Sequence, residues 1–311
     1  MFVFEKEQLI HNIGDIKIGG SPGETPTVLA GTIFYSGHRI VSDPKKGFFD
    51  KDEASVLLAK QDELAGLTGN PALIQIFAET SEAMIKYIEF VTDQSPAPFL
   101  IDSASSSVRL DGLRYAEEVG LLDMAIYNSL NVSATSDELD TLREIQHECA
   151  IVLAYNPQDS TIAGRRQVLE NGALEQKKGL LDICIDIGIT KPLIDTATTA
   201  LGAGAGSATA FTFVSKTLYG LPTGSGIHNA VSSWDWIRKM KKTNRDVYLT
   251  TDVASNLIVQ MMGADFILYG PIENAVYVYP IVAMGDLFRA ESAYLEFGLE
   301  PGNDHPFKKL L

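Results

Sequence analysis

The chain of 311 residues carries 40 acidic and 25 basic side chains, which gives a formal net charge of −15. This charge repels a polyphosphate backbone, so nucleic acid is an unfavourable partner. The two cysteines, Cys149 and Cys184, form no Cys/His metal pattern, so we expect reduced thiols, no metal site and a cytoplasmic location. The N-terminal MFVFEKEQ lacks the apolar core of a signal peptide, and no apolar run is long enough for membrane insertion.

The first twenty residues differ in pattern from the rest of the chain. Phe2 and Phe4 alternate with polar residues, and Ile16 and Ile18 follow a turn-like Asn12–Gly14 segment. Such alternation around a turn predicts a β-hairpin. We therefore expect residues 1–20 to form a hairpin that caps the N-terminal end of one larger domain, residues 21–311, because no shift in composition marks another boundary.

The larger domain repeats one unit, in which an apolar run ends in a polar residue and a loop and an amphipathic segment follow. The predicted strands begin at Thr27, Ala72, Pro98, Asp123, Cys149, Lys191, Leu221 and Asp265. Their spacings of 25 to 45 residues leave room for a crossover helix, with helices expected over 52–67, 81–91 and 136–147. Eight such units predict an α/β fold, a single (β/α)8 TIM barrel. The strand at Leu221 has little apolar content and is predicted from the rhythm alone.

Polar residues follow the predicted strands, and active sites of such barrels lie at these C-terminal ends. The candidate site residues are Glu79, Asp102, Ser103, Asn128, Tyr155, Asn156, Asp195, His228 and Asn229. No strand end carries Lys or Arg, so this row is not suited to clamping a phosphate. Carboxylates and amides instead suit a flat heterocycle such as a pterin, whose N3–H and 2-amino group match a carboxylate. Each residue taken singly could also be a helix cap or a turn residue.

Several segments resemble the family of methyltransferase H subunits. They are IKIGGSPGETPTVLAGTIFYSGH (16–38), KKGFFDKDEA (45–54), LTGNP (67–71), FLIDS (99–103), IYNSLN (126–131) and VLAYNPQD (152–159). The family contains the H subunit of archaeal tetrahydromethanopterin S-methyltransferase and bacterial relatives, among them the methylcobalamin:tetrahydrofolate methyltransferase of glycine betaine demethylation. The resemblance covers essentially the whole chain and implies a pterin-binding barrel.

The resemblance also assigns roles to the strand ends. In pterin-binding barrels an Asp after the third strand, an Asn after the fourth and an Asp after the sixth hold the pterin, which matches Asp102, Asn128 and Asp195. Pterin methyltransferases place a further Asn against N5, and Asn229 matches it, although either His228 or Asn229 could face the pterin. Dihydropteroate synthases need a Lys and an Arg where this chain has GIHNA and YGPIEN. Methyl transfer is therefore favoured over pterin condensation.

The implied reaction moves a methyl group from a methylcobalamin-carrying protein to N5 of tetrahydrofolate, or of tetrahydromethanopterin, by SN2 displacement. Asn229, whose amide oxygen would stabilise positive charge on N5, and His228 are the candidate catalytic residues. The chain has no Asp-x-His-x-x-Gly segment to ligate cobalt, so a separate corrinoid protein is the expected partner, alongside a homodimer. Tetrahydrofolate is favoured because nothing ties the chain to a membrane assembly. Two alternatives stay open: a non-catalytic pterin-binding or assembly subunit, and a pterin transferase of the dihydropteroate synthase type.

Three further segments have both a functional and a structural interpretation. GAGAGSA (202–208) resembles a phosphate loop but lacks the following Gly-Lys, which favours a flexible loop. Arg165 and Arg166 could meet a folate's glutamate tail, but a solvated face is the simpler expectation. Trp234 and Trp236 could line a corrinoid entrance or pack against helices.

Overall fold

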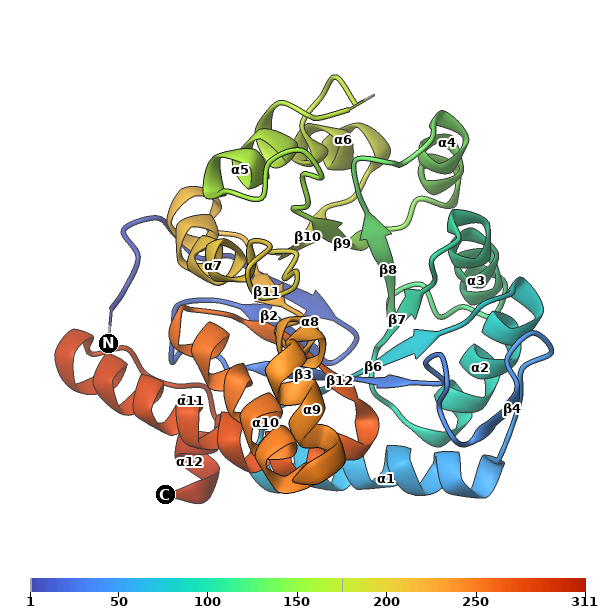
Figure 1. The fold of residues 1–311 in the computed structure, drawn as a ribbon. Helices are drawn as coiled ribbons and strands as arrows, with labels where there is room; N and C mark the ends of the chain where they lie inside the picture. The colour runs from blue at the N-terminus through green and yellow to red at the C-terminus, as the bar shows by residue number, and fades with distance from the viewer. Residues whose placement is uncertain (1, 175) are drawn as a thin grey trace.

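Eight parallel strands close into a barrel in the computed structural model, which describes residues 2–174 and 176–311 (Figure 1). Around the barrel the order is β3, β6, β7, β8, β9, β10, β11 and β12, and β12 pairs with β3 again. The strands are β3 (Val28–Ile33), β6 (Ala72–Phe77), β7 (Phe99–Asp102), β8 (Ala125–Leu130), β9 (Cys149–Leu153), β10 (Lys191–Asp195), β11 (Thr223–Ser225) and β12 (Phe266–Pro271). Each begins within two residues of its predicted start, so the (β/α)8 barrel prediction is confirmed.

Helices surround this barrel and return the chain to the N-terminal end of the next strand. They are α1 (Lys51–Thr68), α2 (Ser81–Gln94), α3 (Ser106–Glu118), α4 (Ser136–Ile145), α5 (Ile162–Glu170), α6 (Leu180–Ile187), α7 (Ala205–Tyr219), α8 (His228–Ser233), α9 (Asp235–Thr243), α10 (Arg245–Met261), η1 (Ile272–Asn274), α11 (Ala275–Phe297) and α12 (Pro306–Leu310). A small antiparallel sheet of β4 (Val41–Asp43) and β5 (Phe48–Phe49) follows β3. No helix of the described residues is both long enough and apolar enough to span a membrane.

The predicted helices begin where expected, but their caps are one residue earlier than the serines suggested. Thr80 accepts a hydrogen bond from the N–H of Ala83, and Thr135 accepts one from Glu138. A threonine hydroxyl in this position satisfies one of the donors that a helix start leaves unpaired. These caps fix where the chain turns from each strand-end loop into its helix.

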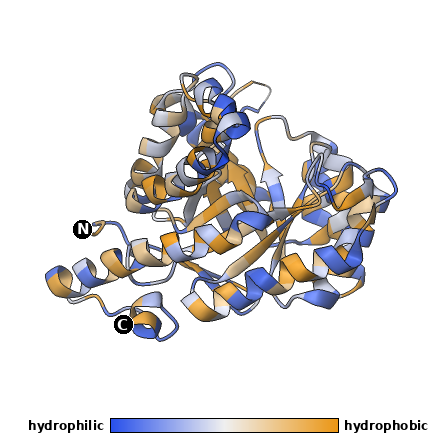
Figure 2. Cartoon of the chain, turned by 60° about the horizontal axis from the view of Figure 1, so that its bottom comes forward, coloured by the Kyte–Doolittle hydropathy of each residue, from blue (hydrophilic) through white to orange (hydrophobic). Residues whose placement is uncertain are grey.

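The apolar core has two layers, one inside the barrel and one between the strands and the helices. Leu73, Leu100 and Ile151 belong to the inner layer, whereas Ile74 and Ile101, their neighbours in sequence, belong to the outer layer. Both faces of a strand are therefore apolar, as in other buried parallel sheets, and Figure 2 shows hydrophobic colour along the barrel strands.

The N-terminal hairpin closes one end of the barrel. Its strands are β1 (Ile10–Ile13) and β2 (Ile16–Gly19), and Ile13 and Ile18 are buried in the inner layer of the core. The N–H of Gly14 donates to the carbonyl of Asp123 at 3.0 Å, just before β8 begins, so the hairpin covers the N-terminal strand ends.

The expectation that Phe2 and Phe4 belong to this hairpin is wrong. Their rings pack instead on Phe213 of α7, with centroid distances of 5.0 and 5.3 Å. Alternation in this stretch therefore reflects an extended segment against a helix, and not strand pairing. The division into residues 1–20 and 21–311 stays a prediction.

Polar contacts hold the short strand β11, which explains how it forms with few apolar residues. The buried ammonium of Lys216 lies 2.8 Å from Asp265 Oδ2, and the same carboxylate oxygen accepts the N–H of Thr223 at 2.8 Å. The hydroxyl groups of Ser215 and Thr223 are 2.9 Å apart. Because a buried ion pair is stable only when its remaining hydrogen bonds are satisfied, these groups together fix the strand that leads to His228 and Asn229.

Candidate functional site

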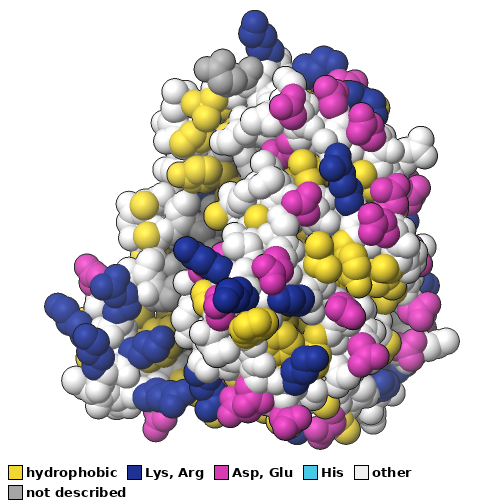
Figure 3. Space-filling view, turned by 90° about the vertical axis from the view of Figure 1, so that its right-hand side faces the viewer, with side chains coloured by type: hydrophobic (Ala, Val, Ile, Leu, Met, Phe, Trp, Pro, Cys, Tyr) yellow, Lys and Arg dark blue, Asp and Glu magenta, His cyan; other side chains and the backbone are white. Residues whose placement is uncertain are grey.

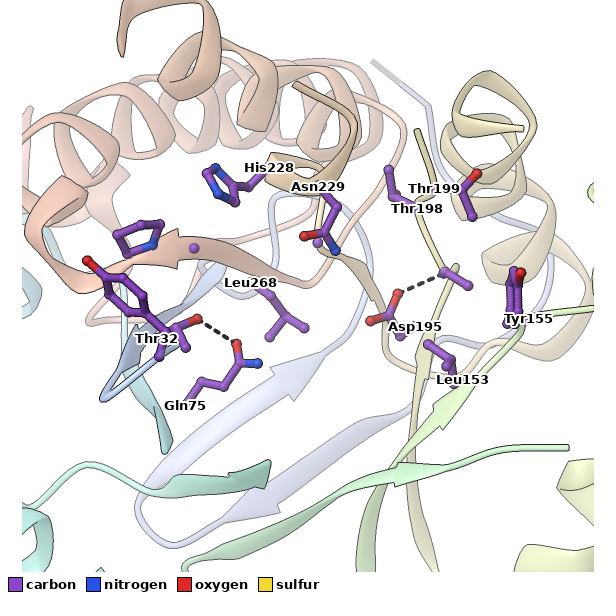
Figure 4. Close-up of a pocket in the computed structure, with 15 residues that line it drawn as sticks. Thr32, Gln75, Leu153, Tyr155, Asp195, Thr198, Thr199, His228, Asn229 and Leu268 are labelled. Atoms are coloured by element: carbon purple, nitrogen blue, oxygen red, sulfur yellow. Dashed lines mark hydrogen bonds between the residues drawn. The ribbon is translucent and has the colours of Figure 1, made fainter. Parts of the chain in front are cut away.

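A hollow of about 470 Å³ opens at the C-terminal ends of the barrel strands (Figure 4). It is lined by Thr32, Tyr35, Gln75, Leu153, Tyr155, Asp195, Ala197, Thr198, Thr199, Gly226, His228, Asn229, Leu268, Gly270 and Pro271. Its size lies within the range of small-molecule sites. None of these lining residues is Lys or Arg, so the hollow itself has the polar but cation-free character that the strand ends predict.

Asp195 ends β10 and presents a buried carboxylate to this hollow. One of its oxygens, Oδ1, accepts the N–H of Ala197 at 2.8 Å, and Ala197 has a φ of 56°, a left-handed conformation that is rare for a residue with a side chain. Burial raises the pKa of Asp195 to about 6, and the negative charge of Asp102 adds to the shift. A carboxylate that is hard to ionise in the empty site is stabilised by a ligand that brings N–H donors to it.

Asp102 and Asn128 lie opposite each other on β7 and β8, on the other side of the barrel mouth from Asp195. Asp102 Oδ2 accepts the amide of Gln75 at 2.6 Å, and the oxygen of that amide accepts the hydroxyl of Thr32 at 3.0 Å. Burial raises the pKa of Asp102 to about 6, although the hydrogen bond from Gln75 opposes the shift. The chain Thr32–Gln75–Asp102 thus continues the lining of the hollow to the third strand.

His228 lies on the opposite rim of the hollow, at the start of α8, and a buried aspartate orients its ring. Nδ1 is 2.8 Å from Oδ1 of Asp252, a residue of α10 that is only 3% exposed. Since a carboxylate only accepts, Nδ1 carries the proton and Nε2 is left for a ligand or water. The ring rests on Gly270, where a Cβ would come within 2.7 Å of it, so this position requires glycine.

Asn229 follows His228 and also faces the hollow, so the structure does not make the two residues alternatives. Figure 4 shows its amide directed into the space between Leu268 and Asp195. Its backbone N–H donates to the carbonyl of Gly226 at 3.1 Å, which fixes the turn from β11 into α8. The side-chain amide has no hydrogen-bond partner among the described residues and is exposed to the hollow. It is therefore available to a ligand.

The other predicted site residues divide into one that lines the hollow and three that do not. The ring of Tyr155 lines it and is 38% exposed. Glu79 is exposed outside it, near enough to Tyr87 to influence the pKa of that phenol. Ser103 accepts the guanidinium of Arg109 on its carbonyl at 2.7 Å, and Asn156 accepts the N–H of Gln158 at 3.0 Å, so both serve local turns.

Comparison with known proteins places this barrel among proteins of recorded function. The family model described as tetrahydromethanopterin S-methyltransferase MtrH subunit matches residues 6–302. The chain belongs to this family. Over 311 residues it is 52% identical to the H subunit of tetrahydromethanopterin S-methyltransferase from Methanothermobacter thermautotrophicus, covering all of both chains. A Methanosarcina barkeri protein, provisionally named as the H subunit of the methyltransferase mtx, is 47% identical over 311 residues, again with full coverage of both chains.

Solved structures agree with the architecture of this MtrH-family barrel. Dihydropteroate synthase from Xanthomonas albilineans, in complex with 7,8-dihydropteroate, superimposes with a TM-score of 0.60 at 15% identity, covering 90% of this chain and 98% of that one. At this level of identity the likeness concerns the fold. It confirms that the MtrH-family chain has the barrel of the pterin-binding proteins.

Two arginines of the MtrH-family chain show where reasoning from polarity fails. Arg166 is solvated and pairs with Glu170 at 3.1 Å, as a surface residue would. Arg165 is 1% exposed, and its guanidinium donates to the carbonyls of Ser160, Thr196 and Ala197. The expectation of a solvated face is therefore wrong for Arg165, which instead ties the loop after β9 to the loop after Asp195.

The remaining segments of the MtrH-family chain also have defined places. The GAGAGSA segment forms a turn and then the start of α7, after β10. Trp234 and Trp236 stack with centroids 5.0 Å apart and are 36% and 50% exposed, so they pack mainly on each other. Among residues 2–174 and 176–311, no three His, Cys, Asp or Glu side chains come together to hold a metal ion.

Four residues that shape the site were not predicted. Thr32 and Gln75 lie inside strands, before the residues that end them, and the twist of the barrel brings them to its mouth. Tyr35 lies in the loop after β3, within a stretch that was read as one polar strand end. Asp252 comes from the middle of α10, and only the contact with His228 reveals its role.

Proposed function

We propose that this protein transfers a methyl group between the corrinoid of a partner protein and N5 of a tetrahydropterin. The observation that carries the proposal is the pair of buried carboxylates, Asp195 and Asp102, on one hollow that Asn229 enters with an unpaired amide. Relatives across the full length of the chain are named as the H subunit of tetrahydromethanopterin S-methyltransferase, which supports methyl transfer as the reaction.

The carboxylates account for binding of the pterin ring. Asp195 keeps Oδ2 free for a ligand, because the described hydrogen bond to Ala197 uses Oδ1. The N3–H and 2-amino group of a pterin form a donor edge that a carboxylate accepts with two parallel hydrogen bonds. Asn128, with both an acceptor and donors, can satisfy the remaining mixed edge of the ring. We propose that Asp102, Asn128 and Asp195 together hold the ring, with Tyr155 beside it.

Asn229 accounts for the chemical step. When the methyl group moves to the pterin, the N5 lone pair forms the new carbon–nitrogen bond and the carbon–cobalt pair of electrons stays with cobalt, reducing Co(III) to Co(I). Positive charge grows on N5, and the amide oxygen of Asn229 would stabilise it more than it stabilises the neutral amine. That difference lowers the barrier, since only interactions that strengthen in the transition state accelerate a reaction. His228, held by Asp252, is the group best placed to hold or relay a proton through Nε2.

Two tetrahydropterins are candidates. Tetrahydrofolate was favoured because the sequence carries no membrane segment, but relatives of 43% to 52% identity are named for tetrahydromethanopterin, which favours the latter. A test with both is decisive. The purified protein is mixed without oxygen with methylcobalamin and either tetrahydropterin, and the absorption of the methyl-Co(III) species is followed.

Loss of this absorption with formation of N5-methyl pterin is the expected result. A protein that binds either pterin but leaves methylcobalamin intact, also when a corrinoid protein carries it, would instead be a non-catalytic binding subunit. Formation of a pteroate from a pterin pyrophosphate would indicate the dihydropteroate synthase reaction. The cation-free lining of the hollow argues against that reaction, because it offers nothing to stabilise a pyrophosphate leaving group.

A further inference from the structure

A second hollow of about 580 Å³ adjoins the pterin hollow and has the opposite electrostatic character. The two share Tyr35, His228 and Pro271 in their linings. The second one is also lined by four cationic side chains from α9 and the start of α10, namely Arg238, Lys241, Lys242 and Arg245. In a chain with a net charge of −15, such a concentration is unusual. Figure 3 shows Lys and Arg gathered at its lower left, whereas acidic groups predominate at its right.

Contacts within the protein leave most of this positive charge uncompensated. Arg238 has Asp235 at 3.6 Å, but both side chains are largely exposed. Lys241 lies over the ring of Tyr248 at 4.7 Å, and neither Lys242 nor Arg245 has an ion pair within the described part of the chain. Four cations brought together without acidic partners repel one another, so this arrangement gains stability when an anion binds.

One acidic residue lines the second hollow, and other groups already occupy it. Glu273 Oε1 accepts the hydroxyl of Tyr35 at 2.9 Å and lies 3.2 Å from Nε2 of His38. This carboxylate therefore orients Tyr35 at the boundary between the two hollows and does not neutralise α9. A ligand that passes the ring of Tyr35 leaves the cation-free hollow and enters the cationic one.

We propose that the second hollow binds the anionic tail of the same ligand whose pterin ring occupies the first. This inference rests on the function proposed above. Tetrahydropterin coenzymes carry acidic groups at the end of a tail attached to the ring, so one molecule presents a neutral heterocycle and a distant anion. The continuous hollows match this order: carboxylates and amides at Asp195 and Asn229, then His228 and Tyr35, then Lys242 and Arg245.

An acidic patch on a partner protein is the main alternative occupant of α9. The concave shape and the shared lining favour the tail, because a flat protein surface would not need a cavity continuous with the pterin site. The exposed pair Trp234 and Trp236 is not part of the second lining, so it offers a separate surface to a partner.

Ligands with and without a tail test the proposal. Calorimetry under anaerobic conditions would compare tetrahydrofolate, its triglutamate form and 6-methyltetrahydropterin, which has no tail. The test variant is Lys242→Gln with Arg245→Gln, and Lys239→Gln is the matched control, because Lys239 lies on the same helix outside the hollow. Loss of two partly exposed charge contacts should raise the Kd for the tailed ligands about 5-fold or more, and most for the triglutamate.

The same variant should bind the tail-less pterin as wild type does, and its affinity for tailed ligands should depend less on salt. Equal affinity of the variant and wild type for tailed ligands would overturn the proposal. So would an equal loss for all three ligands, or a defect seen only in transfer from a corrinoid protein, which would assign α9 to partner docking. If wild type binds none of the three, the proposed pterin function itself fails, and that outcome is distinct from a variant that binds all of them normally.

Discussion

Substituting Asp195 by Asn gives opposite expectations for ligand binding and for stability. The asparagine keeps an oxygen for the N–H of Ala197, so the loop after β10 should hold its shape. The other oxygen becomes an amino group, which meets the N–H donors of a pterin with donors of its own. Leaving such a buried donor unpaired costs about 1–3 kcal/mol, which corresponds to a rise in Kd of roughly 5- to 150-fold.

Stability of the unliganded protein should change in the other direction. Burial and Asp102 raise the pKa of Asp195 to about 6, so at pH 7 the folded protein holds an ionised group in an unfavourable place. Each unit of a raised pKa represents about 1.4 kcal/mol, so removing the charge should increase the free energy of unfolding by about 1–3 kcal/mol.

The assay is titration calorimetry for pterin binding together with thermal unfolding of the same samples. Asp159→Asn is the matched control, because Asp159 lies in the loop after β9 and caps a local turn through Thr161 without lining the hollow. Weaker binding with a higher Tm is expected for the Asp195 variant, and no change in binding for the control. Unchanged pterin affinity would remove Asp195 from the site, and weaker binding with a lower Tm would indicate damage to the loop.

Three further results are expected. Asn229→Ala should slow methyl transfer about 100-fold while changing the Kd for the pterin less than about 5-fold; similar losses in both would contradict a role at N5. Pterin affinity should rise with pH through about 6, because Asp102 and Asp195 must ionise to accept the ring, and an affinity that is flat or falls between pH 5 and 7 would refute that requirement. Ile18→Ala, in the fully buried hairpin, should lower the free energy of unfolding by about 2–4 kcal/mol without affecting pterin affinity, whereas Val56→Ala, 68% exposed on α1, should do neither.

Much of the fold was predictable because each barrel unit leaves a local signal. A buried strand is apolar on both faces, and the turn after it needs a polar or capping residue, so runs such as that ending at Asp102 mark their own ends. The strand β11 gave no such signal, since Lys216 and Asp265 stabilise it through contacts distant in sequence. Phe2 and Phe4 gave a misleading one, because alternation does not distinguish a paired strand from a segment lying on a helix.

The site was predictable at the strand ends and not between elements. Asp195 and Asn229 could be found because the C-terminal ends of parallel strands share one edge. Gln75 was missed because it lies within a strand, and Asp252 because it belongs to a helix that supports the site from behind. Arg165 was misjudged because hydrophilic character predicts exposure, whereas its guanidinium is buried by carbonyl groups from two loops.

The closed base of the barrel has a consequence for the order of events during turnover. Ile13 and Ile18 fill the N-terminal end, so a ligand of the mouth enters and leaves through the mouth alone. A methyl-carrying partner that docks there would cover the only route of exchange. Pterin binding should therefore precede docking, and the modified pterin should depart after the partner dissociates. Slow partner release would then limit the turnover rate, and rapid-mixing experiments would show one fast methyl transfer followed by slower cycles.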